Sequence, residues 1–150
     1  MTVGDKAPAV LGIDQDGREV RLADFAGKTL VLYFYPKDNT PGCTAEACSL
    51  RDNISELAAK GYAVVGVSSD SEASHQRFRQ KHELPFTLIS DPEHKLQEEM
   101  GVWGEKVMCG RHYMGTLRTT FIIGPDGTIT HVFGPKAIKT KTHADQILAL

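Results

Sequence analysis

Long apolar runs are absent from this sequence of 150 residues. A membrane-spanning helix needs about 20 consecutive apolar residues, and no stretch approaches that length. The opening residues, MTVGDKAPAVLG, have neither the basic start nor the apolar centre of a secretory signal. We therefore predict a cytoplasmic protein that does not act at a membrane.

The sequence also lacks an excess of either charge. The 17 Lys and Arg residues stand against 19 Asp and Glu residues, which gives a formal net charge of −2. The basic residues are scattered, apart from the short run KAIKTK at 136–141, which is typical of a solvated loop. This distribution gives no electrostatic basis for binding nucleic acid or an anionic lipid surface. Repeats and low-complexity segments are missing too, so we expect residues 1–150 to form one domain.

Cysteine is scarce, with three residues in the whole chain. In a reducing compartment such cysteines are catalytic, metal-binding or inert more often than structural disulfides. A zinc site would have to use Cys43, Cys48, Cys109 and His112. The spacing argues against it, because a C-x4-C pair on an intact helix points its sulfurs apart and the gap to Cys109 is long. The six histidines show no ligand spacing either, so we predict no metal and treat Cys109 as a bystander.

The remaining pattern alternates strands with helices. A turn at 14–17 separates two short extended runs and predicts an N-terminal β-hairpin. The run TLVLYFYP at 29–36 is apolar on both faces, as in a central strand of a sheet. Further strands are expected at 62–70, 84–90, 118–124 and 128–134, and helices at 44–60, 71–82, 92–101 and 142–150. This order predicts an α/β fold in which helices flank a central mixed sheet.

Two of the cysteines lie five residues apart at the start of the helix expected to end at residue 60. At about 100° per residue, Cys43 shares the apolar face with Ala47 and Leu50, whereas Cys48 lies about 140° away. Helix geometry separates their Cα atoms by about 8–9 Å, and a disulfide needs roughly 4.4–6.8 Å. A C-x-x-C type reductase and a structural disulfide are both disfavoured by this geometry. A third interpretation is that Cys43 reacts first, the helix start unwinds, and Cys48 then joins it.

The surroundings of Cys43 in the sequence suit a reactive thiol. The stretch PKDNTPGC places it near a helix N-terminus, where free N–H groups and the helix dipole stabilise an anion. Thr40 supplies a hydroxyl three residues earlier, and Pro36 and Pro41 stiffen the loop. The alternative is that Cys43 is a small buried apolar residue and Cys48 an inert surface thiol.

The pattern P-x-x-x-T-x-x-C formed by Pro36, Thr40 and Cys43 resembles the active-site motif of the peroxiredoxins. The C-x4-C pair resembles the Q-type subfamily, also called bacterioferritin comigratory proteins. The similarity extends over the chain, from GDKAPAVLG through LYFYPKDNTPGCTAEACSLRD to GTLRTTFIIGPDG. It implies a thioredoxin-like fold and a peroxidase that uses neither metal nor haem.

The resemblance also implies roles for individual residues. Cys43 corresponds to the peroxidatic cysteine, Cys48 to the resolving cysteine, Thr40 to the active-site threonine and Pro36 to the shielding proline. Arg118 resembles the family arginine. An always-charged guanidinium near Cys43 would favour the thiolate and hold a peroxide oxygen; otherwise Arg118 is a surface residue capping a strand.

Substrate binding is implied for Thr40, Gly42, Cys43 and Arg118. Glu46 either joins this cluster or favours the helix N-terminus. The implied reaction reduces hydrogen peroxide and organic hydroperoxides through a Cys43 sulfenic acid and a Cys43–Cys48 disulfide. Thioredoxin or glutaredoxin would supply the electrons to a monomeric enzyme. The alternative function is a thiol-based redox sensor or holdase, which would not turn over repeatedly.

Overall fold

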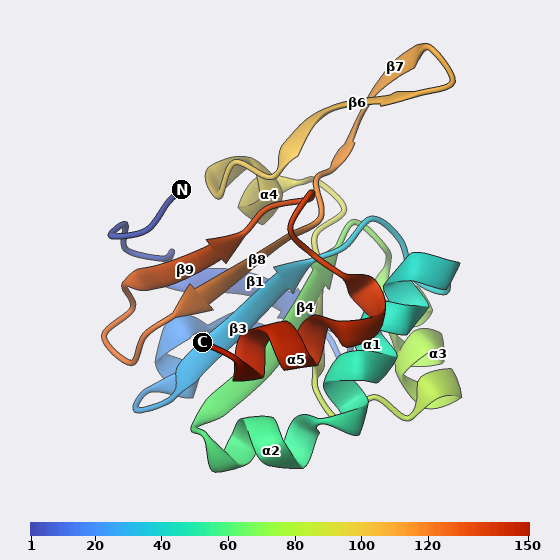
Figure 1. Cartoon of the computed structure of the whole chain (residues 1–150). Coiled ribbons are helices and arrows are strands. Elements are labelled where there is room, and N and C mark those ends of the chain that lie inside the picture. Colours follow the sequence, from blue (N-terminus) through green and yellow to red (C-terminus); the bar gives the residue numbers. More distant parts are fainter.

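The computed structural model describes residues 1–150, and its centre is a seven-stranded mixed β-sheet (Figure 1). The strands of this sheet are β1 (Val10–Asp14), β2 (Glu19–Arg21), β3 (Thr29–Phe34), β4 (Tyr62–Ser68), β5 (Thr87–Ser90), β8 (Thr119–Ile123) and β9 (Ile129–Phe133). Their order across the sheet is β2-β1-β5-β4-β3-β8-β9. The inner strands β3, β4 and β5 run parallel, and β1, β2, β8 and β9 pair antiparallel. The expected mixed sheet and N-terminal hairpin are confirmed.

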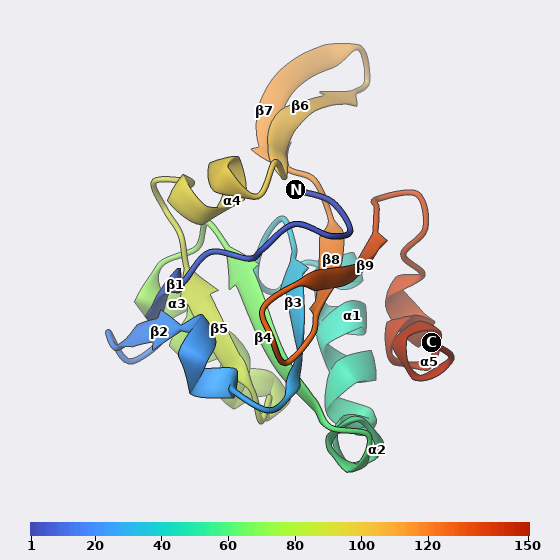
Figure 2. The same cartoon turned by 90° about the vertical axis from the view of Figure 1, so that its left-hand side faces the viewer.

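Helices cover both faces of this sheet (Figure 2). They are α1 (Pro41–Asp52), α2 (Ile54–Ala59), α3 (Glu72–His82), α4 (Lys95–Glu99), α5 (His143–Leu148) and two short 3-10 turns, η1 (Leu22–Phe25) and η2 (Thr140–Thr142). Buried residues of α1, α2, α3 and α5 form one apolar cluster, and those of α4 belong to a second cluster on the other face. No helix is long and apolar enough to cross a membrane.

Strand β3 shows why the sheet is buried on both sides. Val31, Tyr33 and Tyr35 belong to the cluster under α1, whereas Leu30 and Leu32 belong to the opposite one. All five side chains are essentially inaccessible to solvent. Alternation along a strand sends successive side chains to opposite faces, so a run that is apolar throughout fits a sheet covered twice.

The helix expected over 44–60 is instead two helices that meet at Asn53. The Asn53 side chain donates to the carbonyl of Ser49 (2.8 Å), and its backbone leaves the helical region at φ −115° and ψ 15°. An asparagine side chain that bonds nearby carbonyls competes with the helical pattern in this way. The break changes the orientation of the second half. Ala58, which one continuous helix would place on the apolar face with Ala47 and Leu50, is exposed.

Residues 103–116 form a two-stranded hairpin that sequence reasoning did not assign. Strands β6 (Trp103–Met108) and β7 (Arg111–Thr116) pair antiparallel and extend away from the main sheet (Figure 1). Cys109 and Gly110 make the turn with φ of 51° and 79°, the left-handed conformations that tight hairpins need. Several apolar side chains stay exposed here, so neither burial nor alternation marks the hairpin in the sequence. The exposed side chains are Val107, Met108, Tyr113 and Met114.

Gly66 in β4 tests how tightly the sheet packs under α1. A Cβ added there would lie 2.9 Å from Leu88 Cδ2 and from the Tyr33 ring, two fully buried side chains. We expect Gly66→Ala to lower the free energy of unfolding by about 2 kcal/mol in urea titrations, because a packed core cannot absorb the extra methyl group. Gly134→Ala is the matched control, since its Cβ would meet no atom within 4 Å. Equal losses in the two variants would contradict this packing.

Candidate active site

The β3–α1 connection carries the PKDNTPGC stretch to the carboxyl edge of the sheet. Thr40 has extended backbone angles (φ −88°, ψ 155°) and is the N-cap of α1, and Pro41 occupies the first turn, where its missing N–H is no loss. Cys43 is the third residue of this helix and is 1% exposed. The N–H groups of the first helical turn lack intrahelical acceptors, so the start of α1 offers donors to an anion.

Arg118 reaches Cys43 because of the register between β3 and β8. Phe34, at the end of β3, pairs with Thr119, which places Arg118 beside the start of α1. Its Nη2 donates to Cys43 Sγ (3.3 Å), and its Nη1 donates to Glu46 Oε1 (2.6 Å). One guanidinium therefore bridges the thiol and a carboxyl group of the same helix. Gly42 lies directly beside the guanidinium, since a Cβ there would lie 3.4 Å from Nη2.

Glu46 is a fully buried carboxyl group. Burial raises its pKa from 4.5 to about 7, although the charge and hydrogen bond of Arg118 act in the opposite direction. Its second oxygen, Oε2, accepts no hydrogen bond. An ionised carboxylate with one unsolvated oxygen is costly inside a protein, which is why desolvation outweighs the attraction of a single arginine.

His143, at the start of α5, lies beside Glu46 in the interior of the protein. The His143 ring has no solvent exposure, and its Nε2 lies 2.8 Å from Thr120 Oγ1 and 3.8 Å from Glu46 Oε2. Its Nδ1 lies 2.9 Å from Gln146 Oε1. Burial lowers the pKa of His143, with Arg118 acting in the same direction, so the neutral ring is favoured. The neighbouring Tyr33 hydroxyl is buried without a hydrogen-bond partner, and burial raises its pKa well above 10.

The structure thus brings together Gly42, Cys43, Glu46 and Arg118. Thr40 lies at the N-cap, but its hydroxyl donates to the carbonyl of Lys37 (2.9 Å) rather than to the sulfur. Pro36 is half-buried in the same loop.

Cys48 is half-buried further along α1, and all three thiols are free. The residue therefore belongs to the helix of Cys43 but not to the cluster that surrounds its sulfur.

Lys106, a lysine close enough to Arg118 and Cys43 to be affected by their charges, was not identified from the sequence. Its Nζ donates to the carbonyl of Thr116 (3.0 Å). Burial and the nearby Arg118 lower its pKa, whereas Cys43 raises it, which places the ammonium in the field of the active-site charges. Lys106 lies on the hairpin that the sequence did not reveal, and no motif marks it.

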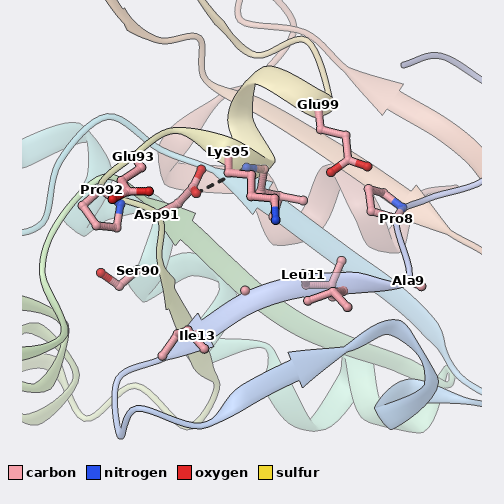
Figure 3. Close-up of a pocket in the computed structure, with 13 residues that line it drawn as sticks. Pro8, Ala9, Leu11, Ile13, Ser90, Asp91, Pro92, Glu93, Lys95 and Glu99 are labelled. Atoms are coloured by element: carbon pink, nitrogen blue, oxygen red, sulfur yellow. Dashed lines mark hydrogen bonds between the residues drawn. The ribbon is translucent and has the colours of Figure 1, made fainter.

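A zinc site built from the cysteines is not formed. Cys109 is exposed at the tip of the β6–β7 hairpin, and the one group of potential ligand side chains that lie together is Asp38, Asp70 and His75. The largest cavity, of about 580 Å³, also lies elsewhere, between β1 and α4 (Figure 3). None of the residues expected in the active site lines it.

Comparison with known proteins identifies the chain. Residues 3–132 match the model of the AhpC/TSA family. The chain is a peroxiredoxin of this family. Peroxiredoxin Bcp of Escherichia coli K12 is 47% identical over 148 residues, which cover 99% of this chain and 94% of that protein. Peroxiredoxin Bcp of Bacillus subtilis 168 is 44% identical over 146 residues, covering 97% of this chain and 92% of that protein.

Solved structures support the assignment of this chain to the peroxiredoxins. The bacterioferritin comigratory protein of Xanthomonas campestris superposes with a TM-score of 0.88 and 34% identity, covering 99% of this chain and 96% of its own. BcpB of Mycobacterium tuberculosis superposes with a TM-score of 0.86 and 33% identity, covering 99% and 95%. The thioredoxin-like peroxiredoxin fold is confirmed, and the enzyme is a thiol-dependent peroxidase.

The raised pKa of Glu46 should make the free energy of unfolding depend on pH. The unfolded chain loses the Glu46 proton near pH 4.5 and the folded protein near pH 7, so stability is lost as the pH rises through this window. Glu46→Gln keeps an acceptor for Arg118 but cannot ionise. The free energy of unfolding of Glu46→Gln, minus that of the parent, should therefore increase as the pH rises from about 5 to about 8. We expect this increase to reach up to about 3 kcal/mol. Both proteins should carry Cys43→Ser to remove the titration of that thiol.

Urea titrations at the two pH values measure this difference. The account of the buried carboxyl group is wrong if the Gln variant and its parent keep the same difference in stability at both pH values.

Proposed function

We propose that Cys43 is the peroxidatic cysteine and that its thiolate attacks one peroxide oxygen in line with the O–O bond. The observation that carries the proposal is the 3.3 Å contact from Arg118 Nη2 to the Cys43 sulfur at a helix N-terminus. Both features favour the thiolate, which is the nucleophilic form. The attack forms an S–O bond and breaks the O–O bond, leaving a Cys43 sulfenic acid and an alkoxide or hydroxide.

The leaving oxygen needs donors that are in place before charge develops on it. Arg118 and the free N–H groups at Gly42 and Cys43 supply such donors around the sulfur. Thr40 adds a hydroxyl at the N-cap, once it turns from the Lys37 carbonyl that it now contacts. A proton from solvent then converts the leaving oxygen to an alcohol or water.

Resolution by Cys48 requires part of α1 to unwind. The two cysteines lie five positions apart on an intact helix, so their Cα atoms are about 8–9 Å apart, beyond the reach of a disulfide. Once the first turns open, the Cys48 thiol condenses with the sulfenic acid and releases water. A dithiol donor, thioredoxin or glutaredoxin, then reduces the Cys43–Cys48 disulfide by exchange.

The substrates we propose are hydrogen peroxide and organic hydroperoxides. Support for the organic class comes from the Xanthomonas campestris relative, whose intermediate and ligand-complex structures concern alkyl peroxide reduction.

Three Cys→Ser variants test this reaction with thioredoxin, thioredoxin reductase and NADPH. We expect Cys43→Ser to lose more than about 99% of peroxide turnover, because no nucleophile remains. Cys48→Ser should consume one peroxide per chain and then stall with thioredoxin. Cys109→Ser is the matched control and should keep full activity, because Cys109 is exposed on the hairpin tip.

The same assay separates an enzyme from a redox sensor. Repeated turnover of the wild type supports the peroxidase cycle, whereas a single equivalent consumed in the presence of reductant supports the sensor. Turnover that survives in Cys43→Ser would mean that another thiol is the nucleophile.

A further inference from the structure

A buried acidic side chain, Asp38, makes several hydrogen bonds from the loop that precedes Cys43. Asp38 lies in the β3–α1 connection, two residues before Thr40, and is 7% exposed. It accepts hydrogen bonds from the Tyr35 hydroxyl (2.6 Å) and from the Ser74 hydroxyl (2.8 Å). Ser74 belongs to α3, so Asp38 ties the active-site loop to a different helix.

The third partner of Asp38 is His75, whose ring has no solvent exposure. His75 Nε2 donates to the carbonyl of Ile89 (2.9 Å), because a carbonyl can only accept. The other ring nitrogen, Nδ1, lies 2.7 Å from Asp38 Oδ2. A proton must lie between these two atoms, either on the imidazole or on the carboxyl group, since two bare acceptors would repel each other. The pair is thus a charge-assisted or strong neutral hydrogen bond shielded from water.

The backbone of the loop is held as well. The Asp38 N–H donates to Asp70 Oδ2 (2.8 Å), and Asp70 is itself fixed by the Ser68 hydroxyl (2.6 Å). Every contact of Asp38 beyond Tyr35 is made to residues 68–75, outside the loop and outside α1. The contacts therefore exist only while the loop is docked.

We propose that the Asp38–His75 pair is a latch that holds the β3–α1 loop and the start of α1 in the closed arrangement around Cys43. This inference rests on the proposed function in one respect: the latch opposes the unwinding that brings Cys48 to Cys43. Asp38 acts by positioning, since it contacts neither the sulfur nor Arg118.

The latch bears on the fate of the Cys43 sulfenic acid. Condensation with the Cys48 thiol forms an S–S bond and releases water, and it needs the open loop. A second hydroperoxide instead transfers one oxygen to the sulfenic acid, giving a sulfinic acid and an alcohol, and it needs the closed loop. A stronger latch favours the sulfinic product, and a weaker latch favours the disulfide.

Hydrogen exchange in the reduced protein tests the latch without any peroxide chemistry. Asp38→Ala removes the contacts to Tyr35, Ser74 and His75, and we expect amides of residues 40–48 to exchange at least about tenfold faster. Amides of β8 should not change.

Asp38→Asn should stay within about threefold of the wild type. Its amide can donate to the neutral His75 ring and its carbonyl oxygen can accept from Tyr35, so this variant keeps the connection. Asp91→Ala is the matched control. Asp91 is similarly buried at 8%, and its side chain accepts from the backbone N–H groups of Leu96 and Gln97 in α4. Figure 3 shows Asp91 beside this helix. Its loss should leave exchange at 40–48 unchanged.

The second measurement uses mass spectrometry after graded hydroperoxide. We expect Asp38→Ala to need at least about tenfold more peroxide than the wild type to reach equal amounts of sulfinic acid and disulfide. Asp38→Asn and Asp91→Ala should remain close to the wild type.

The outcomes separate the two proposals. Unchanged exchange at 40–48 in Asp38→Ala overturns the latch, whatever the enzyme does with peroxide. Faster exchange with an unchanged product ratio overturns its influence on the sulfenic acid. If the wild type forms no Cys43–Cys48 disulfide, the proposed function fails, and the exchange data alone decide on the latch.

Discussion

The rest of the site depends on the fork that Arg118 makes between Cys43 Sγ and Glu46 Oε1. A guanidinium keeps its charge and presents its donors in one plane, so it contacts both groups at once. The fork places this cation against a sulfur that is otherwise buried. The sheet supplies the cation through the β3–β8 register, and α1 supplies the thiol and the carboxyl group on one buried face. The Arg118 side chain therefore links the sheet to the two functional groups of α1.

The proposed reaction places two opposing demands on α1. In the proposed reaction, peroxide attack needs α1 intact around Cys43, whereas resolution by Cys48 needs the first turns of α1 to open. Glu46 weakens the closed state when it ionises, because burial raises its pKa to about 7. The contacts of Asp38 with α3 strengthen that state. In this proposal, two buried acidic groups, Asp38 before Cys43 in the chain and Glu46 after it, act in opposite directions on the closed loop.

Local patterns predicted the elements of the fold, but pairs distant in sequence had to be seen in the structure. Helical periodicity placed Cys43 on the buried face of its helix, and the apolar run at 29–36 is the central strand. The contacts of Arg118 with Cys43 and Glu46 span 75 and 72 residues, and only the resemblance suggested the first. The break at Asn53 depends on one hydrogen bond from its side chain to a backbone carbonyl. The hairpin at 103–116 was not predicted because its apolar residues are exposed and do not follow the pattern of a buried strand.

The most direct test is the rate at which iodoacetamide alkylates Cys43 at about pH 6, in a parent carrying Cys48→Ser and Cys109→Ser. Alkylation reports the reactive thiolate form, and Arg118 Nη2 is the cationic donor in contact with the Cys43 sulfur. We predict that Arg118→Gln slows the reaction at least about tenfold, that Arg118→Lys falls between, and that exposed Arg77→Gln has no effect. An unchanged rate in Arg118→Gln would contradict the central place given to the fork.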